Sequence, residues 1–573
     1  MSKKVLIVGG VAGGASAAAR LRRLDENAEI IMFERDEYIS FANCGLPYYI
    51  GETIKDRNKL IVQTPKSLKS RFNIDVRNNS EVIGIDTDKK IATIRSREKG
   101  VYEESYDYMV LSPGARPIKP NIEGINHERI FTLRNIPDTD KIKAYVDKQG
   151  IKSAIVIGGG YVGVEMAENL KHRGLEVTMV EAAPHIMAPL DTDLVVLVEK
   201  EIKNQGVLLI LNDGVKAFKD LDGGVEITLN SDTKLSADLV ILAIGVIPDT
   251  GFLKDSKIIL GAKGHIVVNE KLETNAVNVY AVGDAIEIVD FVTKQVGAVA
   301  LAGPANKQGR IAADNIAGLN SSYKGTQGTS IIKVFGLTAA GTGNNERSLN
   351  RLKIPYKAIT IHPASRASYY PGGSQMTLKL IFNYKGQILG AQSVGVDGVD
   401  KRIDVIATVI RLGGTVTDLT ELELCYAPPF SSAKDPVNMA GYVAQNVLNG
   451  IVDTMTVEQF MDYDHENTVV LDVRTESEYE DGHFEGALNI PVDSLRERLG
   501  ELDKNKEILE YCQVGLRGYV AYRILTQKGF EVKNIGGGYK SASSLNLTPA
   551  SVDYSDKIKK LVIDSETQVV KSE

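Results

Sequence analysis

Two cysteines far apart in the chain have neighbours that could make them reactive. Cys44 lies in the segment SFANCG (40–45), just after a glycine-rich stretch typical of a dinucleotide-binding unit. Cys512 begins the loop CQVGLR (512–517), which carries glycine and arginine. A thiol beside a redox cofactor and another in an anion-binding loop both suit chemistry at sulfur–sulfur bonds. We therefore expect a protein that moves electrons onto such bonds.

Composition restricts the class of protein further. The 573 residues predict about four domains, and 43% apolar with 25% charged residues is ordinary for a globular protein. A net charge of −7 argues against nucleic acid or a membrane surface as a general partner. There are 3 cysteines, with no C-x-x-C pair and no metal-ligand spacing, so we expect no metal site and a reducing, cytoplasmic location.

The elements that must position Cys44 form a repeated pattern. A strand at 5–8, the loop GGVAGG (9–14), a helix through 24 and a strand at 30–33 end in Glu34. The same order returns as a strand at 154–157, the loop GGGYVG (158–163), a helix to about 172 and a strand at 177–180, ending in Glu181. This is an internal duplication of a nucleotide-binding unit.

The second unit predicts an NADH site. Gly158, Gly160 and Gly163 complete G-x-G-x-x-G between a strand and a helix, where backbone N–H groups can approach a pyrophosphate. Glu181 can accept hydrogen bonds from the adenosine ribose and would repel a 2′-phosphate, so NADH should be preferred over NADPH. The competing interpretation of Glu181 is a solvated strand end.

The first unit predicts an FAD site. Its loop departs from the pattern, because Val11 stands where the middle glycine is expected. The segment NVYAVGDA (278–285) resembles the second flavin signature of the pyridine nucleotide–disulfide oxidoreductases, so one FAD unit is expected to be split by the NADH unit. The residues expected to bind FAD are Gly9, Gly10, Ala12, Gly13, Gly14, Glu34, Gly114, Gly283 and Asp284.

The whole chain resembles CoA-disulfide reductases that carry a fused C-terminal rhodanese domain, a group also described as CoA-persulfide or polysulfide reductases. The motifs are SFANC (40–44), YAPPF (426–430) with KD (434–435), LDVR (471–474) and GHFEGA (482–487). The resemblance implies an α/β fold with two Rossmann-like domains, an α+β dimerisation domain and an α/β rhodanese domain. The expected domains are FAD-binding parts at 1–120 and 251–325, an NADH domain at 121–250, an interface domain at 326–450, a rhodanese domain at 451–545 and a tail at 546–573.

Cys44 stands alone, so it cannot close an internal disulfide. It is expected to cycle between thiolate and a mixed disulfide or persulfide with its substrate, fed by the flavin. An inert buried cysteine is the alternative. The resemblance also implies a homodimer in which Tyr369 and Tyr426 of one subunit approach the other's cysteine, where phenolic O–H groups could protonate a leaving thiolate. Tyr370 could replace Tyr369, or the aromatic residues could serve only packing.

Helix spacing supports an anionic substrate. Ser16, Arg20 and Arg23 fall at i, i+4 and i+7, hence on one helical face. That face could simply be solvated, but the resemblance assigns it to coenzyme A, with the arginines on phosphates. The remaining residues that the resemblance assigns to coenzyme A are Ser40, Asn43, Arg71, Asn306 and Lys434.

The C-terminal loop predicts sulfur transfer. Successive N–H groups and the N-terminus of a following helix should lower the pKa of the Cys512 thiol, and Arg517 adds positive charge. Asp472 and Arg474 should brace the loop. A phosphatase of C-x5-R type is the alternative for this domain, although the loop is one residue shorter than that pattern.

The combined expectation is a flavoenzyme that reduces CoA persulfide, polysulfide or CoA disulfide with NADH, while Cys512 carries sulfane sulfur. Two alternatives remain. One is an NADH oxidase or peroxidase that cycles Cys44 through sulfenic acid. The other is a sulfur carrier in which the flavin is structural.

Overall fold

The computed structural model describes residues 2–463 and 467–546 and contains two compact units. The first unit holds the residues up to Pro184 together with Val207–Thr326. The second holds His185–Gly206 and the described residues from Gln327 onward. The tail expected at 546–573 lies, from residue 547 on, outside the described residues.

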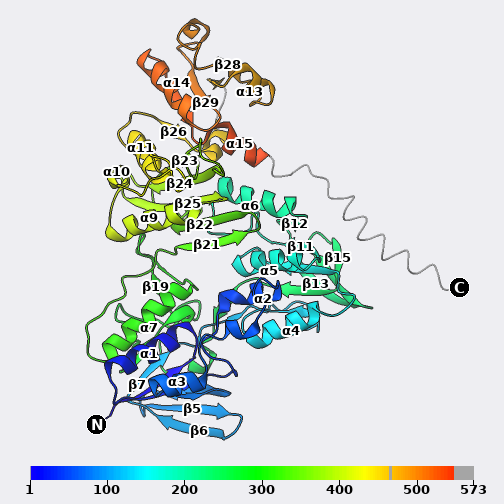
Figure 1. The fold of residues 1–573 in the computed structure, drawn as a ribbon, viewed down its shortest axis with the longest axis vertical. Coiled ribbons are helices and arrows are strands. Elements are labelled where there is room, and N and C mark those ends of the chain that lie inside the picture. Colours follow the sequence, from blue (N-terminus) through cyan, green and yellow to red (C-terminus); the bar gives the residue numbers. More distant parts are fainter. Residues whose placement is uncertain (1, 464–466, 547–573) are drawn as a thin grey trace, which may run out of the picture. The chain divides into compact units, whose positions relative to one another are not determined.

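The first nucleotide unit is a parallel sheet in the order β18-β7-β1-β2-β3. Val5, Leu6 and Ile7 in its central strand are completely buried, as expected for a strand covered on both faces. Helices α1 and α7 pack against each other beside this sheet (Figure 1). The elements are β1 (Lys4–Val8), α1 (Ala12–Leu24), β2 (Glu29–Phe33), α3 (Pro65–Phe72), β3 (Asp75–Arg77), β4 (Ser80–Asp86), β5 (Ile91–Ser96), β6 (Gly100–Ser105), β7 (Tyr108–Leu111), β18 (Val279–Ala281) and α7 (Ala302–Ile316).

The second nucleotide unit repeats this plan, with a parallel sheet in the order β12-β11-β10-β16-β9 and a three-stranded antiparallel sheet, β13-β14-β15. The predicted duplication is therefore confirmed. Two short strands outside these sheets, β8 (Ala115–Pro117) and β17 (Val246–Pro248), pair with each other antiparallel. The other elements are β9 (Ile130–Phe131), α4 (Ile136–Val146), β10 (Ser153–Ile157), α5 (Tyr161–His172), β11 (Glu176–Val180), β12 (Leu208–Ile210), β13 (Val215–Leu221), β14 (Gly224–Leu229), β15 (Lys234–Ala237) and β16 (Leu239–Leu242).

The second compact unit, which lies outside both nucleotide units, contains an antiparallel sheet in the order β21-β22-β25-β24-β23. Helix α6 (Thr192–Asn204) belongs to this unit although it follows the second nucleotide loop in the chain. The remaining elements are β21 (Ser330–Val334), β22 (Leu337–Gly343), α8 (Glu346–Leu352), β23 (Lys357–Ile361), β24 (Met376–Phe382), β25 (Ile388–Gly395), α9 (Val399–Leu412), α10 (Val416–Glu421) and α11 (Pro436–Leu448).

The C-terminal part of this unit is a parallel sheet in the order β26-β30-β29-β27-β28. Helix α14 starts at Leu516, so the loop after Cys512 is shorter than predicted and Arg517 lies within the first turn of the helix. The elements are β26 (Thr454–Met455), α12 (Val457–Met461), β27 (Thr468–Asp472), α13 (Glu476–Glu480), β28 (Leu488–Asn489), β29 (Glu507–Tyr511), α14 (Leu516–Gln527), β30 (Val532–Ile535) and α15 (Gly538–Asn546).

The start of helix α15 holds the Cys512 loop in place. The Tyr539 N–H donates to the Cys512 carbonyl at 2.8 Å. In turn, His362, at the end of β23, lies 2.8 Å from the Ser541 hydroxyl through its Nε2 atom. Burial lowers the pKa of His362 to about 4, so the ring is neutral at physiological pH. No helix among residues 2–463 and 467–546 combines the length and apolar character that crossing a bilayer requires.

Candidate functional site: two thiols and two nucleotide loops

The two glycine loops have matching geometry. Gly9 and Gly158 have φ of +94° and +106°, a region open mainly to glycine. A Cβ on Gly14 or on Gly163 would lie 1.9 Å from the carbonyl oxygen of Gly9 or Gly158, respectively, so each helix can begin close to its strand only with glycine there. A Cβ on Gly160 would meet nothing within 4 Å, which leaves the space where a pyrophosphate could approach the backbone.

Each loop is tied to the acidic residue that follows the second strand. Glu34 accepts from the Gly10 N–H at 3.0 Å, and Glu181 accepts from the Gly159 N–H at 2.6 Å. Each carboxylate oxygen keeps a second lone pair, so a ribose hydroxyl can still donate to it. Burial raises the pKa of Glu34 despite these hydrogen bonds. The arrangement fits the adenosine half of a dinucleotide at both loops.

The segment after β18 is held by two side-chain contacts. The Gly283 N–H donates to the Gln308 side chain at 2.7 Å, and Asp284 pairs with Arg134 at 3.2 Å. Gly114 has φ of +70°, and a Cβ there would lie 3.0 Å from the same arginine. Of the other predicted positions, Ala12 and Gly13 lie in the first turn of α1.

Cys44 is exposed and lies in a short 3-10 turn, Asn43–Gly45, immediately before helix α2 (Leu46–Ile50). Ser40 approaches this turn with φ of +45°, a strained conformation for a residue other than glycine. The side-chain oxygen of Asn43 is buried and has no hydrogen-bond partner within the described chain. A buried acceptor next to an exposed thiol is consistent with a ligand that would supply the missing donor.

Two carboxylates act on Cys44: Asp284, which was expected to bind FAD, and Glu165, which the sequence did not single out. Partial burial raises the pKa of the Cys44 thiol, and the negative charges of Glu165 and Asp284 raise it further. Glu165 belongs to α5 of the second nucleotide unit, and the Tyr48 hydroxyl lies 3.4 Å from its carboxyl. Burial raises the pKa of Glu165 to about 7. The thiol therefore lies where elements of both nucleotide units converge.

The residues expected to bind coenzyme A differ in their contacts and exposure. Ser16 contacts Asn306 at 2.5 Å, and Arg20 pairs with Asp314 at 2.7 Å, so both link α1 to α7. Arg20 is thus partly occupied by a structural ion pair. The other two arginines of the set and the lysine are exposed: Arg23, Arg71 and, in the second unit, Lys434.

The two tyrosines expected to act together lie together. The hydroxyls of Tyr369 and Tyr426 are 3.0 Å apart, and the side chains are 73% and 48% exposed. It is Tyr369, not Tyr370, whose hydroxyl forms this contact. The hydrogen bond with Tyr426 raises the pKa of Tyr369, so the phenol keeps its proton at physiological pH.

Cys512 lies in an enclosed anion-binding turn. The residue is 1% exposed, and the Gly515 N–H points at its sulfur at 3.0 Å. Hydrogen bonds from the backbone of Val514, Gly515 and Gly518 favour the thiolate, as predicted. However, burial and the nearby Glu510 outweigh them, so the pKa of Cys512 is raised. The expectation of a lowered pKa is wrong, because it left out the cost of desolvation.

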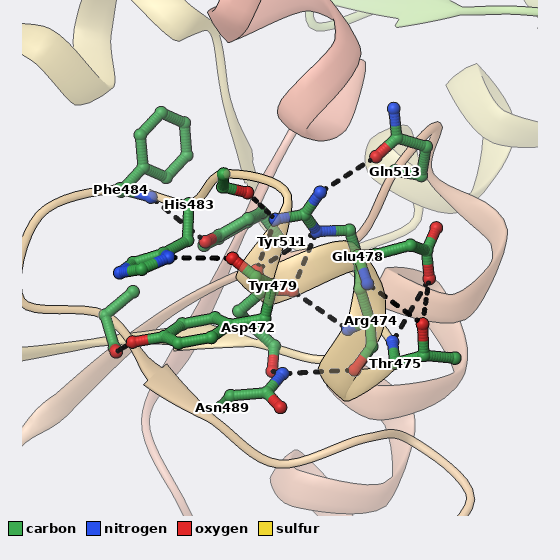
Figure 2. A network of polar contacts seen from close by, with 12 residues as sticks. Asp472, Arg474, Thr475, Glu478, Tyr479, His483, Phe484, Asn489, Tyr511 and Gln513 are labelled. Atoms are coloured by element: carbon green, nitrogen blue, oxygen red, sulfur yellow. Dashed lines mark hydrogen bonds and ion pairs between the residues drawn. The ribbon is translucent and has the colours of Figure 1, made fainter.

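The brace predicted for this loop is present (Figure 2). Arg474 pairs with Asp472 at 2.7 Å, and both side chains are almost wholly buried. The same guanidinium donates to Gln513 in the loop at 3.1 Å and to the Gly482 carbonyl at 2.6 Å. One buried cation therefore joins the end of β27 to the residue that follows Cys512.

Arg517 is held by a residue that the sequence did not single out. Its two terminal nitrogens pair with the Glu478 carboxylate at 2.6 and 2.7 Å. This contact lowers the pKa of Glu478 to about 2, so the ion pair is intact at physiological pH. The positive charge expected from Arg517 is consequently paired with the Glu478 carboxylate.

Comparison with known proteins defines the class. Residues 3–309 match the pyridine nucleotide-disulphide oxidoreductase family, 329–436 match the dimerisation domain of that family, and 456–544 match the rhodanese-like domain. The chain therefore belongs to the pyridine nucleotide-disulphide oxidoreductases. This confirms the resemblance and the fold class that the motifs predicted.

Individual relatives narrow the similarity. The chain is 37% identical to the coenzyme A disulfide reductase of Staphylococcus haemolyticus, over 78% of this chain and 100% of that protein. The crystal structure of reduced Bacillus anthracis CoADR-RHD is 51% identical, covers 95% of this chain and 98% of its own, and has a TM-score of 0.93. A NAD-dependent persulfide reductase from A. fulgidus is 36% identical, covers 93% and 99%, and has a TM-score of 0.87.

Proposed function

We propose that this chain is an NADH-dependent, FAD-containing reductase of CoA persulfide, polysulfide and CoA disulfide, with a sulfur-transfer domain built around Cys512. The observation that carries the proposal is the presence of two different thiol sites in one chain. Cys44 is exposed where elements of both nucleotide units converge, and Cys512 lies in an anion-binding turn. The similarity to coenzyme A disulfide reductases and to a persulfide reductase supports the choice of substrates. The three cysteines of this chain are free, which suits the reducing cytoplasm.

The residues of the two loops fit the two cofactors. The Gly9–Gly14 loop, with Glu34 and Asp284, would hold FAD. The Gly158–Gly163 loop, with Glu181, would hold NADH. When bound, FAD supplies the pair of electrons, taken from NADH, that reduces sulfur bonded to Cys44.

Cys44 performs the exchange step. Its thiolate attacks one sulfur of CoA disulfide and becomes bonded to it, the S–S bond breaks, and the other sulfur leaves as CoA thiolate. With CoA persulfide, the thiolate takes the outer sulfur and CoA thiolate leaves. Two electrons and a proton then return Cys44 to thiolate and release CoA thiol or hydrogen sulfide, respectively.

The hydroxyl pair serves the leaving group. In a homodimer, Tyr369 and Tyr426 of one subunit would reach the Cys44 of its partner, and a phenol that keeps its proton can donate it to a departing thiolate. Dimerisation is supported by the match of residues 329–436 to a dimerisation domain.

Cys512 would load the substrate. It accepts a sulfane sulfur from a polysulfide, whose shortened chain leaves as the anion, and holds the sulfur as a persulfide in the N–H turn. Attack by CoA thiolate on that sulfur then gives CoA persulfide and restores Cys512. A rhodanese-like domain has a use in persulfide and polysulfide reduction that it lacks in reduction of CoA disulfide alone.

The test is steady-state NADH oxidation by wild type, Cys44→Ser and Cys512→Ser. We expect Cys44→Ser to lose at least about 10³-fold in rate with CoA persulfide and with CoA disulfide, because serine cannot form the sulfur–sulfur bond that the exchange step requires. Cys512→Ser should keep both activities and lose turnover only when polysulfide and CoA are supplied together. Oxygen or peroxide as the best acceptor would support the sulfenic acid alternative, and normal sulfane-sulfur turnover in Cys44→Ser would support the carrier alternative.

A further inference from the structure

A carboxyl group lies buried under the Cys512 turn with no cation to balance it. Glu510 in β29 is 0% exposed. The Asn534 side-chain N–H donates to its Oε1, while Oε2 has no hydrogen-bond partner within the described chain. An ionised carboxylate in such a place is costly, and burial raises the pKa of Glu510 to about 8. The group therefore carries its proton at neutral pH.

The carboxyl contacts the same backbone that serves the sulfur. A Cβ built on Gly518 would lie 2.9 Å from Glu510 Oε2 and 2.6 Å from Asn534 Nδ2, so both side chains pack directly against this glycine. The Gly518 backbone also hydrogen-bonds the Cys512 sulfur, and the charge of Glu510 raises the pKa of that thiol. Gly518 thus contacts both the carboxyl and the thiol, and only glycine leaves room for the side chains of Glu510 and Asn534.

The charged groups near β29 are paired with residues other than Glu510. Strand register puts Leu471 and Asn534 beside Glu510, on the face covered by α14. The titratable groups there are Cys512 and Tyr522, the latter one helical turn after Gly518. Helix α14 also carries Arg517, whose guanidinium pairs with Glu478 and not with Glu510. The ion pairs Asp472–Arg474 and Glu507–Lys533 belong to strand positions that alternate to the opposite face. No cation among the described residues pairs with Glu510.

We propose that Glu510 is a positioning residue for sulfur transfer at Cys512: its protonated carboxyl, clamped by Asn534 against Gly518, supports the anion-binding turn from beneath. Loss of that proton puts a negative charge under the turn and opposes both the thiolate and the persulfide anion. The proposal rests on the sulfur-transfer function assigned to Cys512. It implies that the C-terminal site loses efficiency in alkaline solution through a group that never touches the sulfur donor.

The test measures the thiol itself, in the full chain carrying Cys44→Ser and Cys425→Ser so that Cys512 is the one cysteine left. The rate of alkylation by iodoacetamide is followed from pH 6 to pH 10. Glu510→Gln keeps the size of the side chain and the acceptor for Asn534, but has no charge. We expect the Cys512 titration to move to lower pH, with alkylation at pH 9 faster by about three- to tenfold, because one pKa unit is a factor of ten in thiolate.

Glu507→Gln is the matched control, because it removes the same charge from the same strand on the opposite face, and its titration curve should match that of the parent. Glu510→Leu tests the charge separately from the amide and should shift the curve in the same direction. A Glu510→Gln curve that coincides with the parent curve, or that moves to higher pH, overturns the proposal. Alkylation does not depend on sulfur transfer, so absence of polysulfide-dependent turnover in the wild type would refute the proposed function and leave this result standing.

Discussion

Cys44 and Cys512 are the same side chain in opposite surroundings. Cys44 is exposed on a short turn, and its charged neighbours are the carboxylates Glu165 and Asp284. Cys512 is 1% exposed and lies in a turn of N–H groups fixed by a buried arginine. An open thiol suits exchange with a bulky disulfide, and an enclosed one suits storage of a small anionic sulfur. The pKa of both thiols is raised, so reactivity at each must come from what binds there.

The enclosed Cys512 site depends on the buried Asp472–Arg474 ion pair. Breaking this pair should have the largest effect of the changes considered, because it would open the site and remove its difference from the exposed Cys44 site. In Arg474→Ala, Asp472 is left as a buried charge without a cationic partner, which should lower the free energy of unfolding by about 3–5 kcal/mol. Amide hydrogen exchange should show lost protection in residues 467–546, with the first unit unchanged. Arg517→Ala removes an ion pair that is one-third exposed and should cost less than about 1 kcal/mol. If Arg474→Ala and Arg517→Ala lose equal stability, burial of the Asp472–Arg474 pair is not what stabilises the loop.

The open site is proposed to be completed by a second subunit, and mixed dimers sharpen that difference. One subunit carries Cys44→Ser, and the other carries Tyr369→Phe with Tyr426→Phe. Each homodimer should be nearly inactive, whereas the purified heterodimer contains one site free of every substitution. It should therefore recover about half of the wild-type rate of CoA disulfide reduction, as two-fold symmetry requires. A heterodimer no more active than the homodimers would place the tyrosines and the cysteine in the same subunit.

The smallest expected effect concerns the carboxylate near Cys44. The Glu165 negative charge opposes the thiolate, so Glu165→Gln should lower the pKa of Cys44. Half a pKa unit would raise the alkylation rate of Cys44 at pH 8 by roughly threefold. Below pH 6 the difference should vanish, since Glu165, with a pKa of about 7, is then mostly protonated in the wild type. Glu176→Gln, at the exposed start of β11, should leave the rate unchanged.

Local patterns in the sequence predicted most of this molecule. The glycine loops, the strand-end acids and the two candidate cysteines are each contained in one short segment with fixed spacing, so the duplication and the family could be identified. Glu165 could not be found this way, because only tertiary folding brings helix α5 to Cys44. Glu510 looks like an ordinary polar position in the strand EILEY, and the sequence does not reveal that α14 covers it. The direction of the Cys512 pKa shift was missed for the same reason, since desolvation depends on packing that no local motif records.

The insertion of one nucleotide unit into the other affects how the chain can fold during synthesis. Strand β18 joins the first sheet beside β7, yet the ribosome makes it only after the whole second nucleotide unit. At 5–20 residues per second, β7 waits on the order of ten seconds for that neighbour. Its edge must stay free of wrong pairings during this interval, while the inserted unit already has every strand that it needs. Nascent chains halted before residue 279 should therefore contain a protease-resistant second nucleotide unit and an incomplete, protease-sensitive N-terminal sheet.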